Sequence, residues 1–124
     1  VMSVKNEKSI ITDGGVAMVG DYRYEVEFAP IINLSRPSFE LRKKTIYGPT
    51  CDPSDYWGKQ YFGIDIKEGD LLAVINQGAY TFTCAWRFIK PIPPYAAFSG
   101  KDLKSLKLVK KQETFENRYS GCEF

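Results

Sequence analysis

Residues 45–55, Thr-Ile-Tyr-Gly-Pro-Thr-Cys-Asp-Pro-Ser-Asp, decide how the rest of this chain is arranged. They run from a β-prone stretch into a Gly48-Pro49 turn. Glycine can adopt backbone angles that other residues avoid, and proline fixes its own φ. We therefore expect a rigid bend at the end of a strand. The two side chains that it presents are the thiol of Cys51 and the carboxylate of Asp52.

The stretches around this bend predict further strands. Residues 22–28 alternate between apolar and charged, and residues 80–88 alternate again, which is typical of strands with one solvated face. Residues 71–75 form a short apolar run after the Gly69-Asp70 turn signal and predict a buried strand. Residues 56–63 predict an aromatic loop, and residues 101–111 predict either a short basic helix or a strand. Strands separated by glycine and proline turns indicate an all-β sandwich or a Greek-key-like β-barrel.

The composition predicts one folded domain over residues 1–124, with residues 101–124 as a basic C-terminal extension. With 44% hydrophobic residues the chain is rich enough to build a core. Its net charge of +2 gives no reason to expect nucleic acid or a membrane surface as a partner. The longest apolar run is far too short to span a membrane. Because the chain begins at Val1, we expect a piece of a longer protein.

The sequence contains no histidine, and this excludes several kinds of site within the chain. A Ser-His-Asp triad, a Cys-His pair and a histidine-rich zinc site all require that residue. The three cysteines are odd in number and widely spaced, so they predict neither a disulfide framework nor a metal site. They favour a reducing compartment, and we expect a cytoplasmic protein.

The motifs carry a family resemblance. Gly-Pro-Thr-Cys-Asp at 48–52, with Asp55 three residues on, is followed by Gly69-Asp70 and by Gly-Ala-Tyr-Thr at 78–81. Over residues 4–90 this order resembles the C-terminal domain of the ornithine/diaminopimelate/arginine decarboxylases. These enzymes depend on pyridoxal 5'-phosphate and carry an alanine-racemase-like barrel in their N-terminal part. The resemblance implies a β-sandwich-like barrel that works with its own N-terminal barrel and in a homodimer.

The resemblance implies a role for each member of the Cys51-Asp52 pair. By itself a lone cysteine at a turn is a buried thiol, and an aspartate there is a turn or cap residue. In the family, the matching cysteine reaches the active site of the neighbouring subunit and helps deliver a proton after carbon dioxide leaves. The matching acidic residue pairs with the distal cation of a basic amino acid. Aspartate resembles the ornithine, lysine and arginine branch, because diaminopimelate branches tend to carry glutamate.

The second motif implies contacts with the cofactor. Tyr80 is either a core aromatic on the predicted strand 80–88 or, as in the family, a tyrosine that bonds the cofactor phosphate. Gly78 would let the backbone approach closely there. Asp55 is expected to be structural and to cap the loop that follows it.

The sequence departs from the family pattern at two points. One concerns the residues that bind the substrate, and the other concerns the lysine that binds the cofactor. Where the diaminopimelate branch has a substrate-gripping arginine and a tyrosine, this sequence has Asp21 and Glu25. No lysine stands in a motif that matches the cofactor lysine, which in the family lies in the barrel. We therefore expect this chain to be inactive alone.

The sequence is compatible with three functions. The first is the C-terminal domain of a decarboxylase acting on a basic or carboxynorspermidine-like substrate, with diaminopimelate as an alternative. The second is a non-catalytic homologue that regulates other proteins. The third is a free-standing binding module whose aromatics stack a sugar, namely Tyr56, Trp57, Tyr61 and Phe62.

Overall fold

The computed structural model describes residues 1–20, 30–78, 80–100 and 102–123. The chain divides into two compact units, Val1–Trp86 (unit 1) and Arg87–Phe124 (unit 2). Each unit is described by itself below. The expectation of one domain over residues 1–124 stays a prediction.

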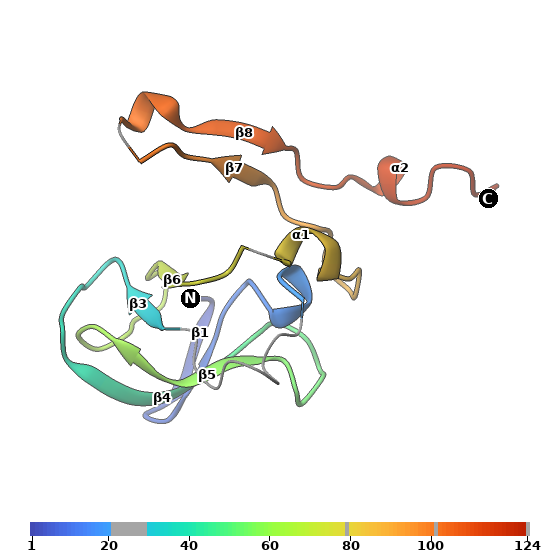
Figure 1. The fold of residues 1–124 in the computed structure, drawn as a ribbon. Helices are drawn as coiled ribbons and strands as arrows, with labels where there is room; N and C mark the ends of the chain where they lie inside the picture. The colour runs from blue at the N-terminus through green and yellow to red at the C-terminus, as the bar shows by residue number, and fades with distance from the viewer. Residues whose placement is uncertain (21–29, 79, 101, 124) are drawn as a thin grey trace. The chain divides into compact units, whose positions relative to one another are not determined.

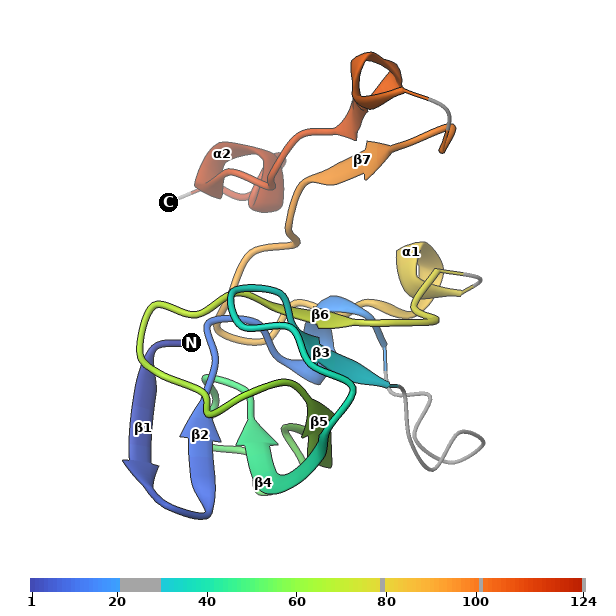
Figure 2. The ribbon, with the colours of Figure 1, turned by 90° about the vertical axis from the view of Figure 1, so that its left-hand side faces the viewer.

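The described part of unit 1 contains a mixed six-stranded sheet in the order β1-β2-β4-β5-β3-β6 (Figures 1 and 2). The strands are β1 (Ser3–Asn6), β2 (Ser9–Ile11), β3 (Ile31–Asn33), β4 (Leu41–Tyr47), β5 (Tyr56–Phe62) and β6 (Leu72–Val74). β2 lies parallel to β4, and β3 lies parallel to β5, whereas the other neighbours are antiparallel. The all-β fold class is confirmed.

The core of unit 1 is built where these strands meet. One buried residue comes from each central strand, and Ile66 joins them from the β5–β6 connection; the cluster is Ile10, Ile31, Ile46, Tyr61 and Ile66. Ile10 and Ile46 stand opposite each other in the β2–β4 register. Fully burying one such aliphatic side chain stabilises the fold by about 1.5–3 kcal/mol. The packing of these side chains therefore holds β4 and β5 in place, and with them the loop between those strands.

Two sequence predictions about secondary structure are wrong. Residues 56–62 form strand β5, because β-prone aromatics pair with β4 in the Tyr47–Tyr56 and Arg42–Tyr61 registers. Residues 80–88 do not form a strand, because the backbone N–H groups of Thr83 and Cys84 donate to the Tyr80 carbonyl. These local bonds close the short helix α1 (Thr81–Cys84).

The strand and the turn predicted around Gly69 are present in the structure. The strand at 71–75 is confirmed as β6, although its residues are half-buried rather than buried. Gly69 has a φ of 85°, as the predicted tight turn requires. A short 3-10 helix, η1 (Val16–Met18), follows the Asp-Gly-Gly stop. The strand predicted at 22–28, and with it Asp21 and Glu25, lies outside the described residues.

Unit 2 pairs β7 (Tyr95–Ala97) with β8 (Lys107–Lys110) in an antiparallel ribbon (Figure 1). A 3-10 turn, η2 (Leu103–Ser105), precedes β8. Residues 101–111, for which the sequence predicted either a short helix or a strand, therefore contain a helical turn followed by a strand. The last helix, α2 (Phe115–Arg118), begins at Thr114, whose hydroxyl accepts from the N–H of Asn117. The side chain of Glu113 accepts from the Arg87 guanidinium and from the Ile92 N–H.

Candidate functional site

The candidate site begins with the loop of residues 48–55, which joins β4 to β5. Its ends are closed because the Gly48 N–H donates to the Asp55 carbonyl at 2.8 Å. Inside it, the Asp55 N–H donates to the Asp52 carbonyl at 2.9 Å. Cys51 and Asp52 stand at the exposed part of this loop. The alternative of a buried turn thiol at Cys51 is therefore excluded, and both predicted groups are accessible on one bend.

Asp52 also has a local structural task. One of its carboxylate oxygens, Oδ1, accepts from the backbone N–H of Ser54 at 2.7 Å. Such a bond from an aspartate to the second residue after it closes an Asx turn. The bond fixes the direction of the carboxylate while the residue remains exposed. The turn role and the substrate role predicted for Asp52 are therefore compatible.

The buried side chain of Asp55 anchors the loop through hydrogen bonds. Only 3% of the residue is exposed. Oδ1 accepts from the N–H of Val16 at 2.9 Å, and Oδ2 accepts from the N–H and the hydroxyl of Thr50 at 3.0 and 2.7 Å. The structural role expected for Asp55 is confirmed. Its carboxylate reaches back to Thr50 and across to Val16, however, and does not cap the loop that follows.

The glycines around Asp55 are required for space. A Cβ atom on Gly48 would lie 2.2 Å from both carboxylate oxygens of Asp55, and a Cβ on Gly15 would lie 2.5 Å from one of them. Neither glycine has a positive φ. The reason predicted for Gly48, an unusual backbone conformation, is therefore wrong. Gly48 leaves room for a buried carboxylate.

The second motif leads into α1, whose first residue is Thr81. Tyr80 directly precedes the helix, and 62% of the residue is exposed, so it is not a core aromatic. Its carbonyl anchors the first turn of the helix. A Cβ on Gly78 would meet no atom of the described chain within 4 Å. Any close approach at Gly78 therefore has to involve another part of the protein or a ligand.

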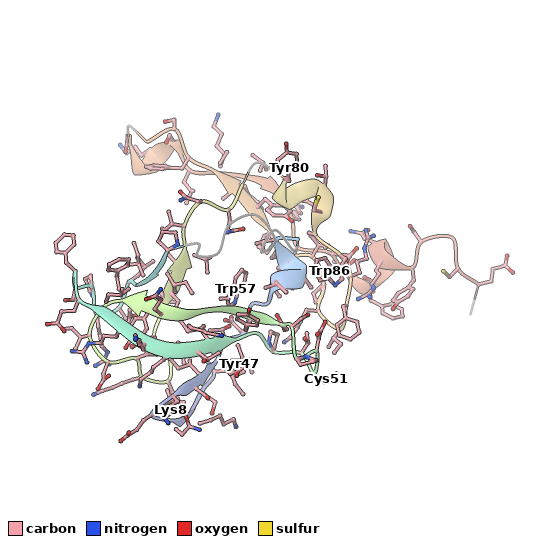
Figure 3. All side chains as sticks on the ribbon, turned by 60° about the horizontal axis from the view of Figure 1, so that its bottom comes forward. Lys8, Tyr47, Cys51, Trp57, Tyr80 and Trp86 are labelled. Atoms are coloured by element: carbon pink, nitrogen blue, oxygen red, sulfur yellow. The ribbon has the colours of Figure 1, made fainter. Side chains whose placement is uncertain are left out.

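One segment connects the two motifs. Residues 14–20 contact the Cys51 loop through the Val16–Asp55 bond, and the Ala17 carbonyl accepts from the N–H of Trp86 at 2.9 Å. Gly20, with a φ of 77°, packs so closely against Cys84 that a Cβ there would lie 2.5 Å from the Cys84 Cβ. Figure 3 shows Cys51 at one end of the β4–β5 pair and Tyr80 at α1. The Cys51 loop, the last residue of α1 and Trp86 therefore all contact the same short segment.

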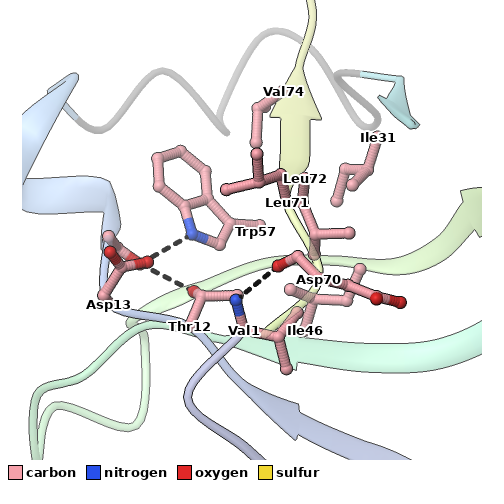
Figure 4. Close-up of a pocket in the computed structure, with 11 residues that line it drawn as sticks. Val1, Thr12, Asp13, Ile31, Ile46, Trp57, Asp70, Leu71, Leu72 and Val74 are labelled. Atoms are coloured by element: carbon pink, nitrogen blue, oxygen red, sulfur yellow. Dashed lines mark hydrogen bonds between the residues drawn. The ribbon is translucent and has the colours of Figure 1, made fainter. Parts of the chain in front are cut away.

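A recess of about 290 Å³ lies elsewhere in unit 1 (Figure 4). Trp57 forms one wall, with its Nε1–H donating to the Gly14 carbonyl at 2.9 Å. The Thr12 hydroxyl donates to the same carbonyl at 2.8 Å. None of the four predicted site residues lines this recess, and neither does a lysine. It therefore belongs to the packing of Trp57 rather than to the predicted site.

Asp70 lines this recess and accepts several hydrogen bonds. Burial alone would raise the pKa of Asp70. Hydrogen bonds from the Lys67 N–H, the Asn33 amide and the Arg36 guanidinium instead hold that pKa below its usual value. These bonds tie β3 to the turn before β6, so we assign Asp70 to the fold.

Within the described ranges, no group of three or more Cys, Asp or Glu side chains is arranged to hold a metal ion. In the same part of the chain, no helix has the length and apolarity to cross a membrane. None of the three cysteines, all of which are described, forms a disulfide.

Part of this chain matches a known protein family. Residues 1–78 match the family model described as the C-terminal sheet domain of pyridoxal-dependent decarboxylases. This chain belongs to that family. The resemblance derived from the Cys51 and Tyr80 motifs is therefore confirmed.

Curated relatives agree with this assignment. The chain is 36% identical over 85 residues to the L-glutamyl-[BtrI acyl-carrier protein] decarboxylase of Niallia circulans, covering 61% of this chain and 20% of that protein. It is 30% identical over 108 residues to the diaminopimelate decarboxylase of Methanothermobacter thermautotrophicus, covering 85% of this chain and 23% of the relative. The chain thus spans about a fifth of the length of these proteins.

Solved structures share the fold. The crystal structure of diaminopimelate decarboxylase from M. jannaschii superposes with a TM-score of 0.79 at 21% identity, covering all of this chain and 29% of that one. The enzyme from Helicobacter pylori complexed with L-lysine has a TM-score of 0.74 at 24% identity, covering 96% and 29%. These likenesses concern the fold alone, and the part of this chain that they cover includes residues beyond the family match.

Proposed function

We propose that this chain is the C-terminal domain of a pyridoxal-phosphate-dependent amino-acid decarboxylase and supplies side chains to an active site that other parts of the enzyme complete. The observation that carries the proposal is the exposure of Cys51 and Asp52 on a loop closed by hydrogen bonds. A thiol and a carboxylate that served only the core would be buried. The N-terminal barrel supplies the cofactor lysine, and the active protein is a cytoplasmic homodimer.

The described residues fit a contact with the cofactor. The exposed Tyr80 carries a hydroxyl that can donate to a phosphate, and among the described residues no atom lies within 4 Å of where a Cβ on Gly78 would stand. When bound, pyridoxal phosphate withdraws electrons from the carbon that loses carbon dioxide. Cys51 would serve as the proton donor, because a side-chain S–H held at a fixed position can deliver a proton to a reacting carbon.

Asp52 suits a substrate with a cation at its far end. A carboxylate beside an ammonium or guanidinium group forms a charge-assisted bond, and substrates that lack the cation leave the acid unpaired. We therefore propose a basic amino acid such as ornithine, lysine or arginine, or a carboxynorspermidine-like compound. Diaminopimelate is the second candidate, because two curated relatives are named diaminopimelate decarboxylases.

The test uses the full-length protein and follows carbon dioxide release from each of these substrates. Cys51→Ala should lower kcat by about 10²–10⁴-fold, the usual contribution of a positioned proton donor. Asp52→Asn should raise KM for the cationic substrate by about tenfold or more. Cys122→Ala is the matched control, since it removes another exposed thiol that has no place in the proposed site. Full activity of Cys51→Ala on every substrate would argue against the proposal.

Contribution across the dimer has its own test. Cys51→Ala subunits are mixed with subunits that lack the barrel lysine, each inactive alone. If one subunit completes the site of its partner, random mixing should restore about a quarter of the wild-type sites. No recovery in mixed dimers would place the thiol in its own subunit's site. The isolated chain with pyridoxal phosphate and borohydride should give no stoichiometric lysine labelling.

A further inference from the structure

Asp55 holds both sides of the Cys51-Asp52 pair. On one side its Oδ2 accepts from the N–H and the hydroxyl of Thr50, the residue before Cys51. On the other side its backbone N–H donates to the carbonyl of Asp52. The two residues that present the thiol and the carboxylate therefore lie between two anchors, and both anchors belong to one buried residue.

The same carboxylate ties the loop to a distant part of the chain. Oδ1 accepts from the N–H of Val16, which opens η1. Gly15, which precedes η1, has no side chain to cap it, so Asp55 supplies the acceptor from across the fold. The next residue of η1, Ala17, is bonded to Trp86, just beyond α1. A continuous series of contacts thus leads from Cys51 through Asp55 and residues 14–20 to the helix that follows Tyr80.

We propose that Asp55 is a positioning residue of the decarboxylase: through Thr50 and Val16 it sets where the Cys51 thiol stands relative to the rest of the site. The inference rests on the proposed function of Cys51. Asp55 does not touch the reacting atoms, because it is buried beneath the loop and pressed between Gly15 and Gly48. Its effect on turnover therefore passes through the thiol.

The hydroxyl of Thr50 provides a graded perturbation with a matched control. Thr50→Val keeps the shape of the side chain and removes the 2.7 Å bond to Oδ2, whereas Thr50→Ser keeps the hydroxyl. Asp55→Asn replaces one carboxylate oxygen by an NH₂ group. Because each of the two oxygens accepts from a backbone N–H, the NH₂ group would then face a second donor. A misplacement of about 1 Å can reduce a rate by 10²-fold. We expect kcat to fall about tenfold in Thr50→Val and up to about a hundredfold in Asp55→Asn, with KM little changed and Thr50→Ser near wild type.

A double-mutant cycle in the full-length enzyme separates positioning from general stability. If Asp55 acts through the thiol, Asp55→Asn or Thr50→Val should lower kcat no further once Cys51 is alanine. Equal fold-losses in both backgrounds would overturn the inference. Should Asp55→Asn fail to fold, the Thr50→Val and Thr50→Ser pair decides the question by the same cycle.

A second readout does not depend on activity and so distinguishes failure of the inference from failure of the proposed function. A nitroxide label on Cys51, with Cys84 and Cys122 changed to serine, reports how tightly the loop is held. The label should become more mobile in Thr50→Val and Asp55→Asn and stay as in wild type in Thr50→Ser. Unchanged mobility in all three would refute the role of Asp55 even if Cys51 proves essential. Increased mobility with no loss when Cys51 is replaced would instead refute the proposed role of the thiol.

Discussion

Replacing Gly48 by alanine tests the close packing around Asp55 most directly. The new Cβ would lie 2.2 Å from both carboxylate oxygens, whereas Cβ contacts under 3.0 Å are essentially never found. The carboxylate would have to move by about an ångström. It would then lose some of its three bonds, to the N–H groups of Val16 and Thr50 and to the Thr50 hydroxyl.

The magnitude follows from these contacts. Overpacking costs about 1–3 kcal/mol, and each hydrogen bond to a charged group that is lost costs about 1.5–3 kcal/mol. The alanine recovers about 0.4–1 kcal/mol by restricting the unfolded chain. We expect the free energy of local opening to fall by about 3 kcal/mol, which corresponds to roughly a hundredfold faster exchange of the protected amides.

Hydrogen exchange in the full-length protein is the suitable assay, because unfolding of a multidomain enzyme is not a two-state process. The amides of Val16 and Thr50 report the two anchors separately. Gly14→Ala is the matched control: its Cβ would meet Met18 and Trp57 at 3.7 and 3.8 Å, which are ordinary contacts. We expect the control to change the opening free energy by less than about 0.5 kcal/mol. Wild-type exchange at both amides in Gly48→Ala would show that the packing is not rigid and would refute the reasoning.

Two further predictions concern the core and the turn before β6. Because the pKa of Asp70 is depressed in the folded state, its stabilising contribution is present above its unfolded value of about 4 and is lost as the pH falls through the folded value. Opening free energies of the amides around Asp70, from hydrogen exchange corrected for the intrinsic effect of pH, should therefore fall on acidification in wild type and less steeply in Asp70→Asn; equal falls would contradict this assignment. Ile10 is fully buried, so Ile10→Ala should destabilise unit 1 by about 2–5 kcal/mol and Ile10→Val by only about 0.5–1.5 kcal/mol. Equal opening free energies in hydrogen exchange for the two variants would mean that the Ile10 site does not pack as described.

The sequence alone predicts the parts of this molecule that depend on neighbouring residues. The bend at Gly48-Pro49, the turn at Gly69 and the strand after it all carry local signals, and the structure contains each of them. Cys51 and Asp52 could be placed at this bend for the same reason, whereas local signals favoured a buried thiol and the structure shows Cys51 exposed. The family relationship was likewise readable, because its motifs are ordered runs of residues.

What could not be predicted depends on residues far apart in the chain. The distant partner of the Asp55 carboxylate is the N–H of Val16, and no pattern near either residue points to the other. The requirement for glycine at positions 15 and 48 arises only when the carboxylate is placed between them. The alternation at 80–88 resembles a strand, but local hydrogen bonds to the Tyr80 carbonyl favour a helical turn. An aspartate that follows a turn, together with unexplained glycines in two segments, is the signal that could have suggested the Asp55 contacts.

The topology of unit 1 also implies an order of assembly. β4 and β5 are joined by one short loop, whereas β2 pairs with β4, and β3 with β5, across much longer stretches of chain. Closing a long loop costs more conformational entropy than closing a short one, so the β4–β5 hairpin can form before the parallel pairs. The bend that carries the thiol therefore acquires its shape early during folding. Its attachment to Val16 must wait until the N-terminal strands have joined the sheet.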